Sequence, residues 1–503
     1  MLYLYPKKLD IDPVGVDINV FIHEETAKRL GINKGDVVVL HFPDGEMGAV
    51  VEYTTSLVGP REIGVPAFVW KRFKFSETTP VMVELLQQAS SMKYISKKLR
   101  GERLNYDEIY AIIKDIADYK LTPVELTYFA ASSYCPGFDM QELLYITKAM
   151  VETGDKLSFD DLGDIVADKH SIGGIPNKAI TPVLVPILIN MGMIVPNTFS
   201  RAITTPAGTA DVLEVLMPVT LTPNQIKATV ETVGGCLAWG GALNIAPVDD
   251  IIIQVEKVLD IESYDKFVAS IMAKKIAMGI KYLLIDVPYG PHAKVPKKDV
   301  KKVTDMFKAV ADYFGIKLVV FARKTFGLDG KGVGPALEAR DVLRILERHI
   351  ERPIHTENVV LEMAAKLGVL SGLYNDEFEA LEKARSILDT GQALETFWEI
   401  AKAQGADSVK RSTDIVLGSQ KASVVWAGKK GEVVGFNPKK IVEVTRLLGA
   451  PADAGAGIYF EVFVGDEVGK ADLVAHLYSS TSHRLELGLK RFEELKHQII
   501  LVE

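Results

Sequence analysis

The stretch 168–178, DKHSIGGIPNK, combines side chains and turn residues that can bind an anion. Lys169 supplies a positive charge and Ser171 a hydroxyl, and Gly173 and Gly174 permit a turn whose backbone N–H groups point outward. The G-x-x-x-x-G-K-[ST] spacing of nucleoside triphosphate sites does not occur, so such ligands are not implied. The stretch predicts an anion site of another kind, and a purely structural glycine turn is the alternative interpretation.

The segments on either side of this turn favour the anion site. Residues 162–167 (LGDIVA) predict a short strand, and the apolar residues 179–191 predict a helix. A helix that starts directly after a glycine turn presents free N–H groups and the positive end of its dipole to a ligand.

A second polar stretch, 198–211 (TFSRAITTPAGTAD), follows after about one β-α unit. It holds five hydroxyl side chains and one arginine, a composition that does not suit a core. We interpret it as a second wall of the anion site, with hydroxyls that donate to phosphate oxygens. The alternative is a plain polar loop in which Thr209 caps a helix at 211–216.

A third stretch, 269–275 (ASIMAKK), places Ser270 and Lys274 four residues apart. On a helix this spacing puts both side chains on one face, where they can reach the same ligand. From these residues alone, a solvated lysine pair is favoured over a site.

Composition restricts the class of protein. The 503 residues are too many for one core and predict three or four domains. The net charge of −8 argues against nucleic-acid binding, and no apolar run is long enough to span a membrane. Two cysteines, Cys135 and Cys236, fit a reducing cytoplasm. Without CxxC, HExxH or clustered histidines, no metal site is expected.

The pattern of predicted elements indicates a multidomain α/β protein. Its parts are a small β-rich N-terminal domain, a helical lobe, a larger α/β lobe with a mainly parallel sheet, and a small α+β C-terminal domain. The expected boundaries are 1–84 for the accessory domain, 85–160 with a returning segment 245–278 for the helical lobe, 161–244 and 279–405 for the α/β lobe, and 412–503 for the C-terminal domain.

Individual elements follow from periodicity. Strands are expected at 14–21, 37–42, 48–53, 63–69, 192–197, 281–287, 316–322, 421–426, 432–436 and 458–464. Helices are expected at 106–119, from Thr122 onward, and at 140–153, 300–313 and 334–348, and residues 224–278 are expected to be mainly helical.

The motifs DKHSIGG, SR-x5-AGTAD and ASIMAKK, in this order and spacing, resemble the thymidine/pyrimidine-nucleoside phosphorylase family. The resemblance extends from about residue 85 to the end of the chain, including LNYDEIYAIIKDI and GDEVGKADLVAHLYSS. It implies a helical lobe and an α/β lobe with the active site between them, and metal-free, reversible phosphorolysis of a glycosidic bond.

The resemblance also implies roles for individual residues. Lys169, Ser171, Ser200 and Thr209, with the turn at Gly173 and Gly174, would hold inorganic phosphate. His170, Ser270 and Lys274 would approach base and sugar. A further phosphate serine of the family falls near Ile180 and Thr181, so only Thr181 is a candidate.

Three departures from the family pattern are informative. The family's pyrimidine-gripping arginine corresponds to Val255, its glycine-rich SGRGLGHTGGT loop is replaced by SRAITTPAGT, and its KVGSGAF segment becomes VPYGPHAK at 287–294. These changes, and the β-rich start of the chain, resemble the archaeal AMP phosphorylase branch of the family.

This branch implies phosphorolysis of a nucleoside 5′-monophosphate, best AMP, to free base and ribose 1,5-bisphosphate in nucleotide degradation. Arg201 or Lys294 would bind the 5′-phosphate, and a carboxylate would protonate the leaving base, Glu262 or else Asp260. The residues expected to contact the nucleotide are Arg201, Ala202, Ile203, Thr204, Thr205, Ser270, Lys274 and Lys294.

The remaining expectations concern partners and alternatives. Phosphate is a substrate and no cofactor is expected; neither nucleic acid nor membrane is an expected partner. The resemblance implies a homodimer, or a higher homo-oligomer, in the cytoplasm. A pyrimidine-nucleoside phosphorylase and a non-catalytic assembly module remain alternatives, as does a phosphoribosyltransferase, which would need an acidic cluster near the first motif.

Overall fold

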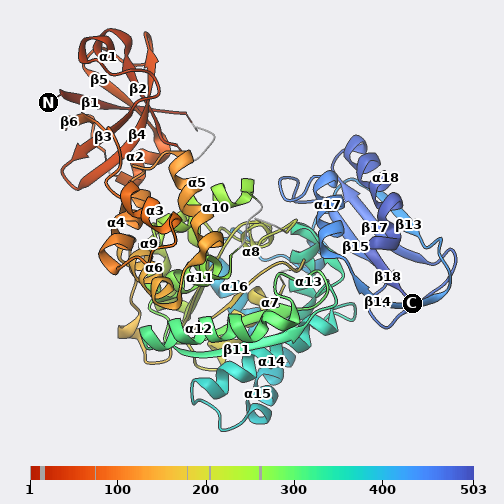
Figure 1. Cartoon of the computed structure of the whole chain (residues 1–503). Coiled ribbons are helices and arrows are strands. Elements are labelled where there is room, and N and C mark those ends of the chain that lie inside the picture. The colour runs from red at the N-terminus through yellow and green to blue at the C-terminus, as the bar shows by residue number, and fades with distance from the viewer. Residues whose placement is uncertain (1, 12–16, 74, 178, 203–204, 260–262) are drawn as a thin grey trace. The chain divides into compact units, whose positions relative to one another are not determined.

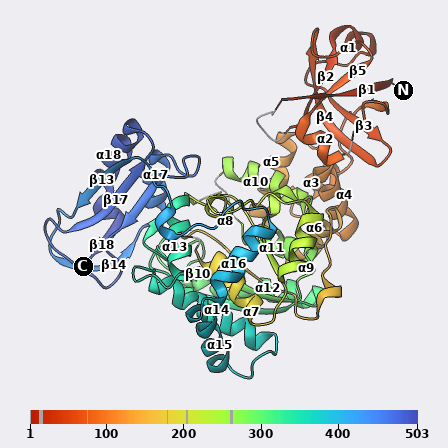
Figure 2. The same cartoon turned by 180° about the vertical axis from the view of Figure 1, so that it is seen from behind.

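The computed structural model describes residues 2–11, 17–73, 75–177, 179–202, 205–259 and 263–503. The chain divides into two compact units, each described by itself below. The first comprises Met1–Asp155 and Asn244–Ala273, and the second Lys156–Leu243 and Lys274–Glu503. Figures 1 and 2 show the chain from opposite sides. The four expected domain boundaries stay predictions.

The first unit begins with a closed β-barrel in the strand order β1-β5-β2-β4-β3-β6 (Figure 1). Its apolar side chains, such as Val20 and Ile22, alternate inward and are fully buried. The barrel elements are β1 Leu2–Leu9, β2 Asn19–His23, α1 Glu24–Leu30, β3 Val37–Phe42, β4 Gly45–Thr54, β5 Glu62–Pro66, α2 Ala67–Phe73 and β6 Val81–Leu85.

Two expected barrel strands differ from the structure. The one expected at 14–21 is described as β2 from Asn19 onward, and residues 12–16 lie outside the described residues. The one expected at 63–69 was wrong beyond Pro66, because the chain turns there into the helix α2. Val69, which β propensity assigned to the strand, is instead buried from a helix.

A helical lobe follows the barrel in the same unit. Its helices are α3 Met92–Leu99, α4 Tyr106–Ala117, α5 Pro123–Ser132, α6 Met140–Glu152, α10 Pro247–Leu259 and the start of α11 Tyr264–Ala277. The expected helix starts are confirmed by capping boxes such as Thr122 with Glu125, each of which satisfies N–H groups at a helix start. Ile109, Ile112, Ile113 and Ile116, whose spacing places them on one face of α4, are all buried.

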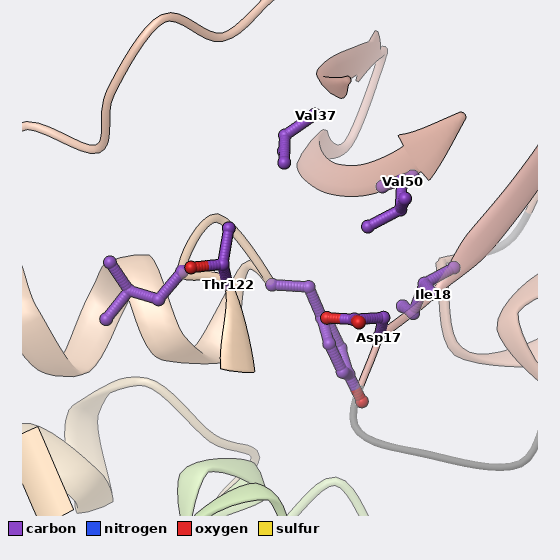
Figure 3. A pocket seen from close by; sticks show the side chains of 8 residues that line it. Asp17, Ile18, Val37, Val50 and Thr122 are labelled. Carbon is purple, nitrogen blue, oxygen red and sulfur yellow. The ribbon is translucent and has the colours of Figure 1, made fainter. Parts of the chain in front are cut away.

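The barrel rests on the turn between α4 and α5 through a backbone contact. The Gly48 N–H donates to the Asp118 carbonyl at 2.6 Å, and a Cβ at position 48 would lie 2.3 Å from the Tyr119 carbonyl oxygen. Only glycine therefore fits at this position. The small pocket beside this contact, which Asp17 and Thr122 help to line (Figure 3), has room for about one water molecule and is too small for a substrate.

The second unit is built on parallel strands, as expected. One sheet has the order β11-β10-β7, with β7 Ala167–Ser171, β10 Tyr282–Tyr289 and β11 Lys317–Lys324. A second parallel pair, β8 Val195–Phe199 and β9 Gly235–Trp239, adjoins β7 through the bridge between Val166 and Ile194. The surrounding helices are α7 Ile180–Asn190, α8 Thr209–Leu213, α9 Pro223–Val233, α12 Val300–Phe314, α13 Pro335–Leu346, α14 Ile354–Leu370, α15 Glu377–Asp389 and α16 Gln392–Ala403.

One prediction about this sheet was wrong. The strand expected at 162–167 begins at Ala167, so it is the polar motif DKHS that pairs with β10. Residues 224–278 are mainly helical, as expected, but they also contain the strand β9, whose five residues are too few to show a period of their own.

The end of the second unit carries two antiparallel sheets, visible in blue in Figure 2. The sheet β12-β15-β17-β13 takes β12 Gly332–Val333 from the preceding α/β segment, which ties the two parts together. The other elements are β13 Gln420–Val425, β14 Gly431–Phe436, α17 Pro438–Leu448, β15 Gly457–Phe460, β16 Glu467–Val468, β17 Leu473–Ser479, α18 Ser482–Ile499 and β18 Ile500–Val502.

Candidate functional site

The strand β7 carries the first motif directly to the edge of a glycine turn. Successive side chains of a strand point to opposite faces, so Lys169 and Ser171 share one face while Asp168 and His170 share the other. Lys169 is 5% exposed, and its Nζ lies 3.4 Å from the Thr181 hydroxyl in the first turn of α7. The predicted phosphate lysine and the candidate Thr181 therefore lie side by side.

The opposite face of β7 explains how a polar motif can form a buried strand. The Asp168 carboxylate and the Lys275 ammonium are both fully buried and lie 2.6 Å apart. Lys275 also donates to the Thr198 carbonyl at 2.9 Å, and Asn197 donates to Asp168. The expectation of a solvated lysine pair was wrong for Lys275, because its charge is neutralised inside the fold.

The next strand holds an aspartate against the first motif. Asp286 of β10 is paired in register with Ser171, is 1% exposed, and accepts the Ile172 N–H on its carbonyl at 3.1 Å. Burial alone would raise the pKa of this carboxyl, but the charges of Arg323 and Lys169, with hydrogen bonds from Arg323 and Ser171, outweigh burial and lower it. The carboxylate is therefore ionised beside the motif.

The turn itself requires glycine and is overlaid by a lysine. Gly173 and Gly174 have φ angles of 81° and 88°, in the left-handed region that favours glycine. The Gly173 N–H donates to the Ser171 hydroxyl oxygen at 3.3 Å. A Cβ on Gly174 would lie 2.8 Å from Cγ of Lys294, whereas one on Gly173 would meet no atom within 4 Å. The structure thus brings the side chain of Lys294, from a separate segment, against the glycine turn that follows Lys169 and Ser171.

Asp211 organises the second polar stretch from within. Its Oδ2 accepts the N–H groups of Ala202 at 2.8 Å and Gly208 at 2.7 Å, and Thr205 donates to the Ala207 carbonyl. The helix α8 begins at Thr209 with Gly208 as its N-cap, so Thr209 is not the cap that the alternative interpretation expected. Many polar groups of this loop are satisfied by the loop itself.

Arg201 is also held inside this region. Its guanidinium pairs with Glu214 at 2.5 Å and Asp211 at 3.5 Å and lies over the Trp239 ring at 4.4 Å. Hydrogen bonding to Glu214 is the main cause that raises its pKa. Its predicted contact with a 5′-phosphate stays a prediction, and it would require competition with two carboxylates.

Several predicted site residues are not tested by this geometry. Glu262, Asp260, Ile203 and Thr204 lie outside the described residues. Ser270 and Lys274 both lie on α11, but in different compact units. The roles of these residues, and those predicted for His170, Ser200 and Thr209, stay predictions.

Sequence reasoning missed the charged residues that support the site. Asp286 lies within the apolar strand β10 and Arg323 near the end of the neighbouring strand β11, and Arg323 pairs with both Asp286 at 2.8 Å and Asp329 at 2.7 Å. The charge of Asp286 inside an apolar strand was the available signal, because a buried charge must be paired. Across the described ranges, no group of three or more His, Cys, Asp or Glu side chains could hold a metal ion. Among the described helices, none is long and apolar enough to cross a membrane.

Comparisons with known proteins agree with this architecture. Residues 92–154 match the model of the helical bundle domain of a glycosyl transferase family, and residues 163–394 match the model of its a/b domain. The fold is similar to the crystal structure of anthranilate phosphoribosyltransferase from Thermus thermophilus, with a TM-score of 0.53 at 17% identity, over 62% of this chain and 99% of that one. The family models and the structural similarity confirm a multidomain α/β protein with a helical bundle domain. The family models place the chain among the glycosyltransferases.

Relatives of nearly full length narrow the class. AMP phosphorylase 1 of Archaeoglobus fulgidus is 37% identical over 480 residues, 94% of this chain and 92% of the relative. AMP phosphorylase of Methanocaldococcus jannaschii is 37% identical over 493 residues, 97% of this chain and 96% of the relative. The chain therefore belongs to this glycosyl transferase family and, within it, to the AMP phosphorylases.

Proposed function

We propose that the chain catalyses the phosphorolysis of AMP to adenine and ribose 1,5-bisphosphate. The observation that carries the proposal is that Lys169 lies in the strand leading into a glycine turn and Lys294 packs against Gly174 of the same turn, in a chain whose relatives of nearly full length are named AMP phosphorylases. The reaction brings two anions together, the attacking phosphate and the 5′-phosphate of AMP. Two separate cations meet that requirement.

In the proposed reaction, one oxygen of inorganic phosphate forms a bond to C1′ of the ribose while the bond from C1′ to N9 of adenine breaks. The bonding electron pair leaves with the base, and a general acid protonates a ring nitrogen so that neutral adenine departs. Glu262, or else Asp260, is proposed as this acid, and His170 is proposed to lie beside sugar and base. No cofactor takes part in this proposal.

The phosphate groups are assigned to different lysines. Lys169, Ser171, Thr181 and the turn at Gly173 and Gly174 bind the attacking phosphate, with Ser200 and Thr209 opposite. Lys294 binds the 5′-phosphate, because Arg201 is already paired with Glu214 and Asp211. Ser270, Lys274 and the segment Ala202 to Thr205 contact the nucleotide. Positioning of this kind supplies a large part of the rate enhancement in a reaction between two bound molecules.

Val255 argues against the pyrimidine-nucleoside alternative. It occupies the position where the resembling family places its pyrimidine-binding arginine, and it is buried within α10. An apolar, buried side chain offers no donor to a pyrimidine carbonyl.

The test is a comparison of substrates with phosphate present. Base release from AMP, CMP, UMP, adenosine and thymidine is followed by chromatography, with consumption of phosphate measured in parallel. Release from monophosphates, with AMP fastest, supports the proposal. Faster release from thymidine than from AMP would overturn it. Lys301→Ala, at an exposed lysine of α12, is the control for Lys169→Ala.

A homo-oligomer and a cytoplasmic location also remain proposals. Two thiols, one exposed at Cys135 and one buried at Cys236, are consistent with a reducing compartment.

A further inference from the structure

We propose that Asp286 is a positioning residue of the phosphate site. Its buried carboxylate holds Lys169 and Ser171 in the geometry that receives inorganic phosphate, and Arg323, clamped by Asp329, holds Asp286 in turn. The inference rests on the proposed function, because it assigns phosphate to the turn after β7.

Asp286 touches the motif through both its main chain and its side chain. Its carbonyl oxygen accepts the Ile172 N–H at 3.1 Å, at the point where β7 passes into the turn. Its carboxylate accepts a hydrogen bond from Ser171 and is attracted electrostatically by the charge of Lys169. The residue therefore supports the end of β7 where the turn begins.

The rest of the network keeps this carboxylate in place. The Arg323 Nε lies 2.8 Å from Asp286 Oδ1, and the two terminal nitrogens of Arg323 each lie 2.7 Å from an oxygen of Asp329. The planar guanidinium spans both carboxylates, and Arg323 is 9% exposed. Such a clamp fixes the position of Asp286 more narrowly than a single ion pair would.

Charge compensation explains why the network contains two acids and two bases. Lys169 and Arg323 balance Asp286 and Asp329, so the buried group is neutral before an anion arrives. Without Arg323, the Asp286 carboxylate would oppose an incoming phosphate. Without Asp286, the positive charge of Lys169 would be buried with fewer negative partners, and burying such a charge costs free energy.

The proposal predicts a change in pH dependence that a purely structural role would not produce. The other charged groups near Lys169 are Arg323 and Asp329 behind Asp286, the Asp168–Lys275 pair on the opposite face of β7, and Lys294 over Gly174. All of these remain in Asp286→Asn. Loss of the Asp286 charge disfavours the charged form of Lys169, so the pKa of Lys169 falls. When the pH is raised, Asp286→Asn should therefore lose phosphate binding at a lower pH than the wild type does.

The experiment measures binding of inorganic phosphate by calorimetry across pH, and steady-state kinetics with phosphate and AMP, on the full chain. For Asp286→Asn we expect the phosphate Kd and the phosphate KM to rise about tenfold or more, a size typical of a charge-assisted contact. The AMP KM should change much less, and the alkaline limb of phosphate binding should move to lower pH.

Glu142→Gln is the matched control. Glu142 is a buried carboxylate paired with the buried Lys98 at 2.7 Å, in the helical lobe of the first unit. It matches Asp286 in burial and pairing, and its hydrogen bonds are with Lys98 and with the backbone of Leu104 and Asp139. We expect it to lower thermal stability without moving the alkaline limb or the ratio of the two KM values.

Asp329→Asn keeps Asp286 and loosens only its clamp, so it provides the same test if Asp286→Asn does not fold. It should raise the phosphate Kd in the same direction by a smaller factor. The inference would be overturned if Asp286→Asn and Asp329→Asn both bound phosphate as tightly as the wild type and lost it at the same alkaline pH. If wild-type protein binds phosphate but releases no adenine from AMP, the proposed function fails, while the effect of Asp286→Asn on phosphate binding still decides the inference.

Discussion

The turn after β7 and the loop from Ser200 to Asp211 are both rich in polar residues, yet they use them in opposite ways. The turn is supported by Asp286 of the neighbouring strand, and a Cβ added to Gly173 would meet no atom within 4 Å. The loop directs its hydrogen bonds inward to Asp211, and its arginine is paired with Asp211 and Glu214. Support by Asp286 of the neighbouring strand leaves the turn itself available for a ligand. The hydrogen bonds and ion pairs within the loop mainly stabilise the loop.

The largest effect is expected at the centre of the turn. Lys169→Ala should reduce kcat/KM for phosphate by on the order of a hundred- to a thousandfold, because it removes the charged donor nearest to Thr181. Steady-state phosphorolysis of AMP measures this. Lys301→Ala on α12 should behave as wild type. A loss under threefold for Lys169→Ala would contradict the role given to the turn.

The two glycines of the turn allow a more specific comparison. Both have positive φ, so alanine strains the backbone in each, at a cost of about 1–2 kcal/mol. Only Gly174→Ala also forces Lys294 away, because the new Cβ would lie 2.8 Å from Cγ of Lys294. We expect Gly174→Ala to raise the AMP KM about tenfold more than Gly173→Ala does, the size of one charge-assisted contact. Equal AMP KM values would remove Lys294 from the 5′-phosphate role.

A smaller effect is expected in the second loop, and it should appear in stability. Asp211→Asn weakens the shared acceptor of two backbone N–H groups and should lower the unfolding free energy by about 1–3 kcal/mol. The change in kcat/KM should be only severalfold. Thermal unfolding and kinetics on the same preparation separate the two effects. Undiminished stability would show that Asp211 does not organise the loop.

The smallest effect is expected at Arg201. If its guanidinium serves Glu214 and Trp239, Arg201→Ala should change the AMP KM by less than about threefold, in the range of an exposed ion pair. The comparison of Arg201→Ala with Lys294→Ala decides which cation binds the 5′-phosphate. An AMP KM raised more by Arg201→Ala than by Lys294→Ala would reverse the assignment.

Sequence reasoning succeeded where the signal was local. The helix start at Thr122, the helix that begins at Met140, the apolar face of α4 and the strands β10 and β11 all follow from residues close together in the chain. The turn at Gly173 and Gly174 was recognised for the same reason, since their positive φ angles are a local requirement.

The residues that were missed depend on partners far away in the chain. The run DKHS did not indicate a strand, because its Asp168 is neutralised by the distant Lys275. Asp286 appeared as an isolated charge in an apolar strand, and only the pairing of β10 with β11 brings Arg323 to it. The strand β9 was hidden inside a helical stretch, because its five residues pair with β8 and not with a sequence neighbour.

The Asp168–Lys275 pair also bears on the order in which the molecule folds. Its two residues are 107 positions apart in the chain, so the pair closes a long loop, and contacts of long sequence separation form slowly. Until α11 brings Lys275 into place, Asp168 is an uncompensated charge at the start of β7, and the strand cannot be buried without cost. We therefore expect the turn after β7 to form late, and a nascent chain that ends before α11 should bind no phosphate at this turn.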